Sequence, residues 1–202
     1  MAIFIYGGSF DPFHLGHQHV IESIPRITFN DKIYIVPTYH TPAKETPIFS
    51  NQSRLEILNV AINSMLECGF NRSLLIDTFE IDKGRQVYAI ETVTYFKRLF
   101  PNENLNFVIG TDCFFNLHTW KQYKELMEMV LFYVVKRDQV ADTTYESYIN
   151  NFFRADKSKF KFIDNEIKEI SSTEVRSQLS NDTWQLFVPK QTIPLIEKRR
   201  LW

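Results

Sequence analysis

The 202-residue sequence predicts a doubly wound α/β fold, in which helices cover both faces of a parallel sheet. Short runs of apolar, β-branched and aromatic residues recur along the chain, as expected of strands that are buried on both faces. Segments with helical periodicity separate these runs. Such alternation is typical of parallel strands joined by right-handed crossovers.

The first part of the chain accounts for most of the expected sheet. Its apolar runs predict five strands, at residues 2–6, 32–36, 74–78, 106–109 and 130–135. The patterns between them predict four helices, at residues 17–24, 52–66, 88–100 and 120–129. Ser50 or Asn51 can cap the second helix, and Pro101 ends the third.

Beyond Asp138 the pattern loosens. We expect a helix at residues 145–153, a short strand at 160–163, a helix from Ser171 to residue 179, and a closing helix at 190–200 with Pro194 in its first turns. We expect a single domain, residues 1–202. Its core would span about residues 1–137, and its small, partly helical C-terminal part about residues 138–202.

Composition excludes several classes of protein. The formal net charge is −1 and the pI is near 6.5, which gives no bulk electrostatic attraction to nucleic acid or to an anionic membrane surface. Cys68 and Cys113 do not form a disulfide framework, and no apolar run approaches the roughly 20 residues that a membrane span needs. We expect a soluble cytoplasmic protein without a nucleic-acid or membrane partner. The 18 phenylalanines can fill a core and an interface, so a homo-oligomer stays open.

The most informative segment follows the first strand. There Gly7-Gly8-Ser9-Phe10-Asp11-Pro12-Phe13 leads into His14-Leu15-Gly16-His17. Glycines let backbone amides approach a phosphate closely, and a helix that starts here favours anions at its N-terminus. His14 and His17 can both point toward one phosphate and donate hydrogen bonds to it.

Two other interpretations of this segment exist. The glycines can form an ordinary turn beside two ordinary polar histidines. Alternatively, His14, His17 and His19 can be metal ligands, although apart from Asp11 and Glu22 no cysteine or carboxylate pair lies nearby at ligand spacing.

Two further segments carry candidate site residues. Ser171, Ser172 and Thr173 predict a helix start that can face an anion, with Arg176 one turn later; a plain helix cap is the alternative. Lys136 and Arg137 follow the fifth strand and can face the same crevice.

Asp112 follows a glycine at a strand end. It can accept a hydrogen bond from a ribose hydroxyl or partner a metal, or merely cap a helix. Trp120 can stack on a flat ring or simply pack between helices.

These motifs resemble those of a known family. The segment from Gly7 to His17 resembles the G-G-[ST]-F-D-P-x-H-x-G-H motif of the H-x-G-H nucleotidyltransferases, most closely that of the bacterial nicotinate mononucleotide adenylyltransferases. Gly110-Thr111-Asp112 with Trp120 resembles the family's G-x-D…W, and residues 170–176 resemble its I-S-S-T-x-[VI]-R. In family order, the matches span almost the whole chain.

The resemblance implies a Rossmann-like fold and a reaction. ATP and nicotinate mononucleotide would give deamido-NAD and pyrophosphate, a late step in NAD synthesis. The attack would be in line, without a covalent intermediate, and Mg²⁺ would bind the ATP phosphates rather than a protein cage.

The resemblance also implies residue roles. His14, His17 and Arg176 would be catalytic. The ATP-binding residues would be Gly7, Gly8, Ser9, Phe10, His14, Gly16, His17, Ser171, Ser172, Thr173 and Arg176. The mononucleotide-binding residues would be Lys44, Tyr88, Ala89, Asp112, Trp120 and Arg137. Arg54 matches a family arginine, and both a structural and a functional role for it stay open.

The chain departs from the family pattern in two places. Residues 41–44 are T-P-A-K where the family has P-P-H-[KR], so the role of the missing imidazole would be either dispensable or taken by His40, while Lys44 can still bind a phosphate as a point charge. Residues 87–89 are V-Y-A where the family has S-Y-T. Both departures concern the acceptor. Nicotinamide mononucleotide or phosphopantetheine as acceptor therefore stays an alternative, as does a nucleotide-binding sensor without turnover.

Overall fold

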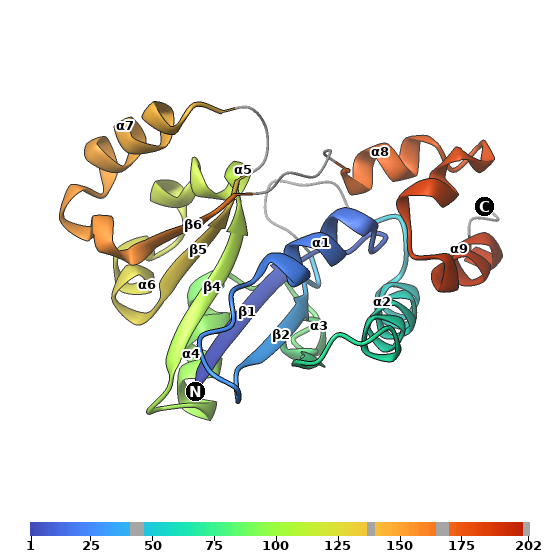
Figure 1. The fold of residues 1–202 in the computed structure, drawn as a ribbon, viewed down its shortest axis with the longest axis horizontal. Helices are drawn as coiled ribbons and strands as arrows, with labels where there is room; N and C mark the ends of the chain where they lie inside the picture. The colour runs from blue at the N-terminus through green and yellow to red at the C-terminus, as the bar shows by residue number, and fades with distance from the viewer. Residues whose placement is uncertain (41–46, 137–139, 165–169, 200–202) are drawn as a thin grey trace.

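The computed structural model describes residues 1–40, 47–136, 140–164 and 170–199 (Figure 1). Its sheet has six strands, all parallel, in the order β3-β2-β1-β4-β5-β6. The strands are β1 (Ala2–Gly8), β2 (Lys32–Pro37), β3 (Ser73–Ile76), β4 (Asn104–Gly110), β5 (Leu131–Val135) and β6 (Phe160–Ile163). The strand order reverses between β1 and β4, which confirms the doubly wound α/β class and places the ligand crevice there.

Helices cover both faces of this sheet. On one face lie α1 (Leu15–Ser23), α2 (Asn51–Glu67), α8 (Ser172–Ser177) and α9 (Ile193–Arg199). The other face is covered by α4 (Ala89–Leu99), α6 (Tyr123–Met129) and α7 (Asp142–Phe152). The short segments are α3 (Phe79–Asp82), α5 (Thr111–Phe114), and the 3₁₀ turns η1 (Leu117–Thr119), η2 (Arg154–Lys159), η3 (Asp182–Phe187) and η4 (Lys190–Thr192).

Strand β1 shows why the apolar runs predicted buried strands. Phe4 and Tyr6 pack on the α1 and α2 side, whereas Ile3 and Ile5 pack on the α4 and α6 side. Side chains alternate across a strand, so a continuous apolar run supplies both cores at once.

Most predicted elements match the structure to within two or three residues, but the helix predicted at residues 120–129 is wrong in its first turn. Helix α6 begins at Tyr123, because Gln122 has a left-handed backbone conformation with φ 53°. Trp120 instead ends η1, where its N–H donates to the carbonyl of Leu117 at 3.0 Å.

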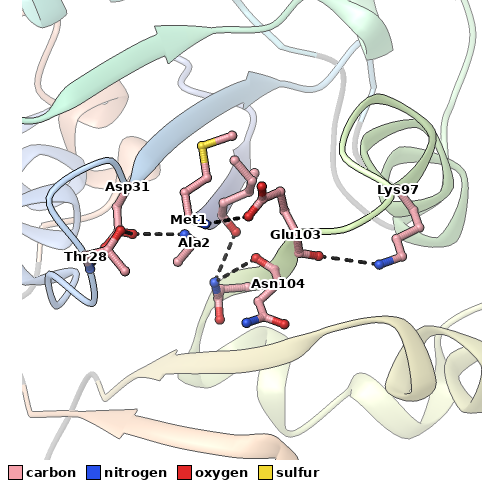
Figure 2. A network of polar contacts seen from close by, with 9 residues as sticks. Met1, Ala2, Thr28, Asp31, Lys97, Glu103 and Asn104 are labelled. Atoms are coloured by element: carbon pink, nitrogen blue, oxygen red, sulfur yellow. Dashed lines mark hydrogen bonds and ion pairs between the residues drawn. The ribbon is translucent and has the colours of Figure 1, made fainter.

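The amino-terminal end of the sheet is fixed by a buried carboxylate (Figure 2). Asp31 accepts hydrogen bonds from the backbone N–H groups of Ala2 (3.0 Å), Ile27 (2.7 Å) and Thr28 (2.8 Å), and from the Thr28 hydroxyl (2.6 Å). Burial alone would raise the pKa of Asp31, but these hydrogen bonds outweigh it and lower the pKa to about 2.

The C-terminal segments pack against α2 (Figure 1). Trp184 of η3 is fully buried in the core on that face, and Arg199 of α9 pairs with Glu56 of α2. This packing sets where α8 lies. Among the described helices, none combines the length and the apolar composition needed to cross a bilayer.

Candidate functional site

His14 and His17 bind each other across the first turn of α1. The Nδ1 atom of His14 accepts from the N–H of His17, and the Nδ1 atom of His17 accepts from the N–H of His14, each at 3.3 Å. The two rings stack with centroids 3.7 Å apart. Because Nδ1 is the acceptor in both rings, a neutral imidazole carries its proton on Nε2. Each ring therefore presents an N–H donor on the edge away from the helix backbone.

Aromatic rings hold His17 in this position. Phe10 and Phe13 contact it with ring centroids at 4.9 and 5.5 Å. Phe10 is fully buried and has φ 46°, so any contact between Phe10 and a ligand is through its backbone. Its ring also lies against Gly8, where a Cβ would be 3.0 Å away. These contacts leave His17 little rotational freedom.

Gly16 joins the first motif to the last. A Cβ at this position would lie 3.0 Å from the ring of His14 and 3.0 Å from the backbone carbonyl of Ile170. The glycine therefore lets the segment before α8 approach the stacked histidines.

The residues of α8 contact the loop that carries the histidines. Ser172 donates to the carbonyl of Pro12 at 3.3 Å, and Arg176 Nη1 donates to the carbonyl of Asp11 at 2.9 Å. Arg176 Nη2 donates to the Thr173 hydroxyl at 3.2 Å, and its Nη1 lies 3.5 Å from the Asp11 carboxylate. Ser171 caps the helix by accepting from the N–H of Glu174 at 3.1 Å, as its plain structural interpretation predicted. Two motifs that are far apart in the sequence thus meet at one loop.

Asp11 and Arg54, which the sequence did not assign to the site, hold this loop in place. The buried carboxylate of Asp11 accepts from the N–H groups of Ile48 and Phe49, both at 2.9 Å. No periodic signal could have revealed this role, although the Asp-Pro pair indicated a turn.

Arg54 of α2 is fully buried and has a structural role. It donates to the carbonyl of Ser9, to the carbonyl of Thr38 at 2.7 Å and to the Asn51 side chain at 2.7 Å. Burial lowers the pKa of Arg54, and the negative charge of Asp11 partly offsets this effect. Arg54 thereby connects the ends of β1 and β2, and the structure assigns it to positioning the loop.

A second set of predicted residues gathers around the starts of α4 and α6. Tyr88 precedes α4 and donates its N–H to Glu91 at 3.1 Å, and Lys121 Nζ lies 4.5 Å from the centroid of the Tyr88 ring. Ala89 is the first residue of α4, next to this contact. Trp120 is half-buried and meets Phe107 edge to face, with centroids 6.2 Å apart. The contact between Lys121 and Tyr88 therefore brings the start of α4 next to Trp120.

Asp112 lies exposed in the first turn of α5, directly after β4. The register of β1 and β4 pairs Tyr6 with Val108, so Gly8 and Gly110 leave the sheet at the same level. The histidine loop and the Asp112 segment thus leave the sheet on either side of the topological switch point.

Of the three basic residues Lys44, Lys136 and Arg137, which the sequence analysis placed near the site, the structure describes one. Lys44 and Arg137 lie outside the described residues. Lys136 binds Asp142 at 2.7 Å and Asp164 at 2.9 Å, and the hydrogen bonds that its ammonium donates to these two carboxylates raise the pKa of Lys136. Lys136, which the sequence analysis placed after the fifth strand, is thus paired with two carboxylates in the described structure.

The described ranges contain no group of three His, Cys, Asp or Glu side chains able to hold a metal ion. The Nδ1 atoms of His14 and His17 are engaged by backbone N–H groups. A divalent cation at this site would therefore take its ligands mainly from the phosphates of a nucleotide.

Comparisons with known proteins identify the family of the chain. The family model described as cytidylyltransferase-like matches residues 5–178. A protein of Fusobacterium nucleatum subsp. nucleatum, named "Probable nicotinate-nucleotide adenylyltransferase", is 32% identical over 200 residues, which cover 98% of both chains. A Leptospira interrogans protein of the same name is 27% identical over 98% of this chain and 95% of its own.

A solved structure shares the fold. The Plasmodium falciparum nicotinic acid mononucleotide adenylyltransferase complexed with NaAD superimposes with a TM-score of 0.80, covering 99% of this chain and 96% of its own, at 23% identity. At this identity the likeness concerns the fold alone.

Proposed function

We infer that this chain, which belongs to the cytidylyltransferase-like family, transfers an adenylyl group from ATP to nicotinate mononucleotide, giving deamido-NAD and pyrophosphate. One observation carries the proposal. Ser172 and Arg176 of α8 donate to the carbonyls of Pro12 and Asp11, in the short loop that leads directly into the mutually bonded His14 and His17. The names of the relatives support nicotinate mononucleotide as the acceptor.

The chemistry follows from the donors that surround this loop. A phosphate oxygen of the mononucleotide attacks the α-phosphorus of ATP, and the bond from that phosphorus to the α,β-bridging oxygen breaks. The electron pair leaves with pyrophosphate. A phosphate nucleophile is already negatively charged, so the step needs no protein base. What it needs is donors for the charge that builds up on the phosphates.

We assign these donors as follows. The Nε2–H groups of His14 and His17 contact the triphosphate, with His17 nearest the α-phosphate. Arg176, with the Ser172 and Thr173 hydroxyls, contacts the β- and γ-phosphates. The rest of the ATP lies against backbone groups and Ser171. The backbone groups are those of Gly7, Gly8, Ser9, Phe10 and Gly16. ATP enters with Mg²⁺ on its phosphates, which neutralises part of their charge.

On the acceptor side, the Asp112 carboxylate accepts a hydrogen bond from a ribose hydroxyl of the mononucleotide, and Trp120 stacks on its pyridine ring. The backbone amides of Tyr88 and Ala89, at the start of α4, bind the carboxylate of the pyridine ring. Lys44 and Arg137 bind the mononucleotide phosphate.

The test is a measurement of pyrophosphate release. The protein is incubated with ATP and Mg²⁺ together with nicotinate mononucleotide, nicotinamide mononucleotide or phosphopantetheine in separate reactions. We expect the fastest release with the nicotinate. Preference for another acceptor would contradict only the acceptor assignment. No release with any of the three would contradict the transferase proposal and leave a nucleotide-binding protein without turnover.

A further inference from the structure

Helix α7 carries two buried tyrosines that lie three residues apart and therefore on the same face. Tyr145 is 2% exposed and Tyr148 is 9% exposed. Neither residue has a role in the proposed reaction. Their hydroxyl groups nevertheless reach the segment that runs from Thr111 to Trp120.

Tyr145 holds the beginning of that segment. Its hydroxyl lies 2.9 Å from the Thr111 hydroxyl, which in turn lies 3.5 Å from the carbonyl of Val135. When the Thr111 hydroxyl donates to that carbonyl, it accepts from Tyr145. Thr111 is the first residue of α5 and directly precedes Asp112, so this contact fixes the turn of helix that carries the Asp112 side chain.

Tyr148 holds the other end. Its hydroxyl lies 2.7 Å from Nδ1 of His118, and the backbone N–H of His118 points to the same hydroxyl at 3.5 Å. Since the tyrosine oxygen accepts from the backbone, its hydrogen is free to donate to Nδ1, and the neutral imidazole then carries its proton on Nε2. Phe152, one turn further on α7, stacks on the His118 ring at 4.1 Å. The 3₁₀ turn that contains His118 ends at Trp120, whose N–H donates to Leu117.

We propose that Tyr145 and Tyr148 are positioning residues for the acceptor nucleotide, because their hydroxyls fix both ends of the segment that carries Asp112 and Trp120. This inference rests on the proposed function, since Asp112 and Trp120 are its acceptor-binding residues. Burial raises the pKa of Tyr148, which keeps its hydroxyl protonated and able to donate.

The role predicts a selective kinetic effect. Neither tyrosine contacts the histidine loop in the described structure, so ATP binding should not depend on them. Loss of one buried hydrogen bond typically changes a binding equilibrium by about 3- to 10-fold. We therefore expect Tyr148→Phe to raise the KM for nicotinate mononucleotide by about 3- to 10-fold, while the KM for ATP changes by less than about 2-fold. The double variant with Tyr145→Phe should show a larger effect on the same parameter.

Two matched variants separate positioning from general destabilisation. Tyr34→Phe removes a hydroxyl from a half-buried tyrosine that packs on Phe96, away from α7, and should leave both KM values unchanged. His118→Asn places an amide oxygen near the position of Nδ1 and should keep the KM of the wild type, whereas His118→Leu should reproduce the effect of Tyr148→Phe.

The outcomes are distinguishable. Suppose that the wild type turns over nicotinate mononucleotide. The positioning role is then overturned if Tyr148→Phe raises the KM for nicotinate mononucleotide and the KM for ATP equally, or if it changes neither KM. If the wild type releases no pyrophosphate, the proposed function itself has failed. Hydrogen exchange of residues 111–120 adds a readout without substrate: faster exchange in Tyr148→Phe than in Tyr34→Phe supports the tyrosine contacts, and equal exchange contradicts them.

Discussion

Arg176 Nη1 donates a hydrogen bond to the backbone carbonyl of Asp11 at 2.9 Å, although 165 positions separate the two residues in the sequence. The same guanidinium reaches the Thr173 hydroxyl with its other nitrogen. One planar, doubly donating group thus connects the end of the chain to the loop after β1. The proposed phosphate site therefore depends on tertiary structure rather than on one sequence motif.

The first prediction concerns this guanidinium. Arg176→Lys keeps the positive charge but loses the planar pair of donors, and we expect a rise in the KM for ATP of about 10-fold. Steady-state kinetics measures the effect. Arg98→Lys, on the exposed face of α4, is the matched control and should behave as wild type. An unchanged KM for ATP in Arg176→Lys would exclude a contact with the triphosphate.

The second prediction separates the two nitrogens of His17. His17→Asn can keep an acceptor for the N–H of His14 but removes the Nε2–H donor. We expect kcat to fall by about 10²- to 10³-fold with little change in melting temperature, since one transition-state donor is lost. His19→Asn, on the same helix, should retain activity. Near-normal turnover by His17→Asn would assign His17 to helix capping alone.

Much of the fold is predictable from sequence because buried strands need continuous apolar runs and helices need periodic ones. The histidine loop and the Ser171 to Arg176 segment are also visible, because their residue types suit phosphate. The first turn expected for α6 is not there, since Gln122 adopts a left-handed backbone that no periodicity shows. Helices α3 and α5 have four residues each, too few to show a helical period.

The positioning contacts were harder to predict for a different reason. Asp11 binds backbone groups 37 and 38 positions away, and Arg54 binds backbone groups 16 and 45 positions away. Every residue has these backbone groups, so the sequence does not show which of them a side chain will bind. The ion pairs of Lys136 were not predictable either, because its partners, Asp142 and Asp164, become neighbours only when β5, β6 and α7 have packed.

The third prediction concerns Glu80, which is 6% exposed and accepts from the Thr92 hydroxyl at 2.6 Å. Burial raises the pKa of Glu80 to about 7, the hydrogen bond from Thr92 opposes this, and the charge of Glu91 adds to it. An unfolded chain releases this proton near pH 4.5, but the folded chain retains it until about pH 7. Folding stability should therefore fall as pH rises between these values and level off above them.

Glu80→Gln removes this titration. We expect the variant to be more stable than wild type at pH 8, by on the order of 3 kcal/mol, and close to wild type at pH 4.5. Urea unfolding at both pH values measures the difference. A constant difference across this range would show that Glu80 does not titrate in the folded protein as described.

The fourth prediction concerns Asp31, for which folding stability changes with pH in the opposite direction. The pKa of Asp31 is lowered from 3.8 to about 2, so its contribution to stability is fully present above pH 3.8 and is lost as pH falls toward 2. Asp31→Asn should lower the free energy of unfolding by about 2 kcal/mol at pH 7, with the gap to wild type narrowing between pH 4 and pH 2. Asp156→Asn, in η2, is the control variant and should match the stability of wild type. Equal stability of Asp31→Asn and wild type at pH 7 would contradict the network in Figure 2.

The most direct measurement is a crystal structure of the protein with a non-hydrolysable ATP analogue and nicotinate mononucleotide. The account predicts the α-phosphate beside Nε2 of His17, the terminal phosphates beside Arg176 and Ser172, and the pyridine ring on Trp120. A triphosphate bound elsewhere would contradict the account, with Ser172 and Arg176 still bound only to the backbone carbonyls of Pro12 and Asp11.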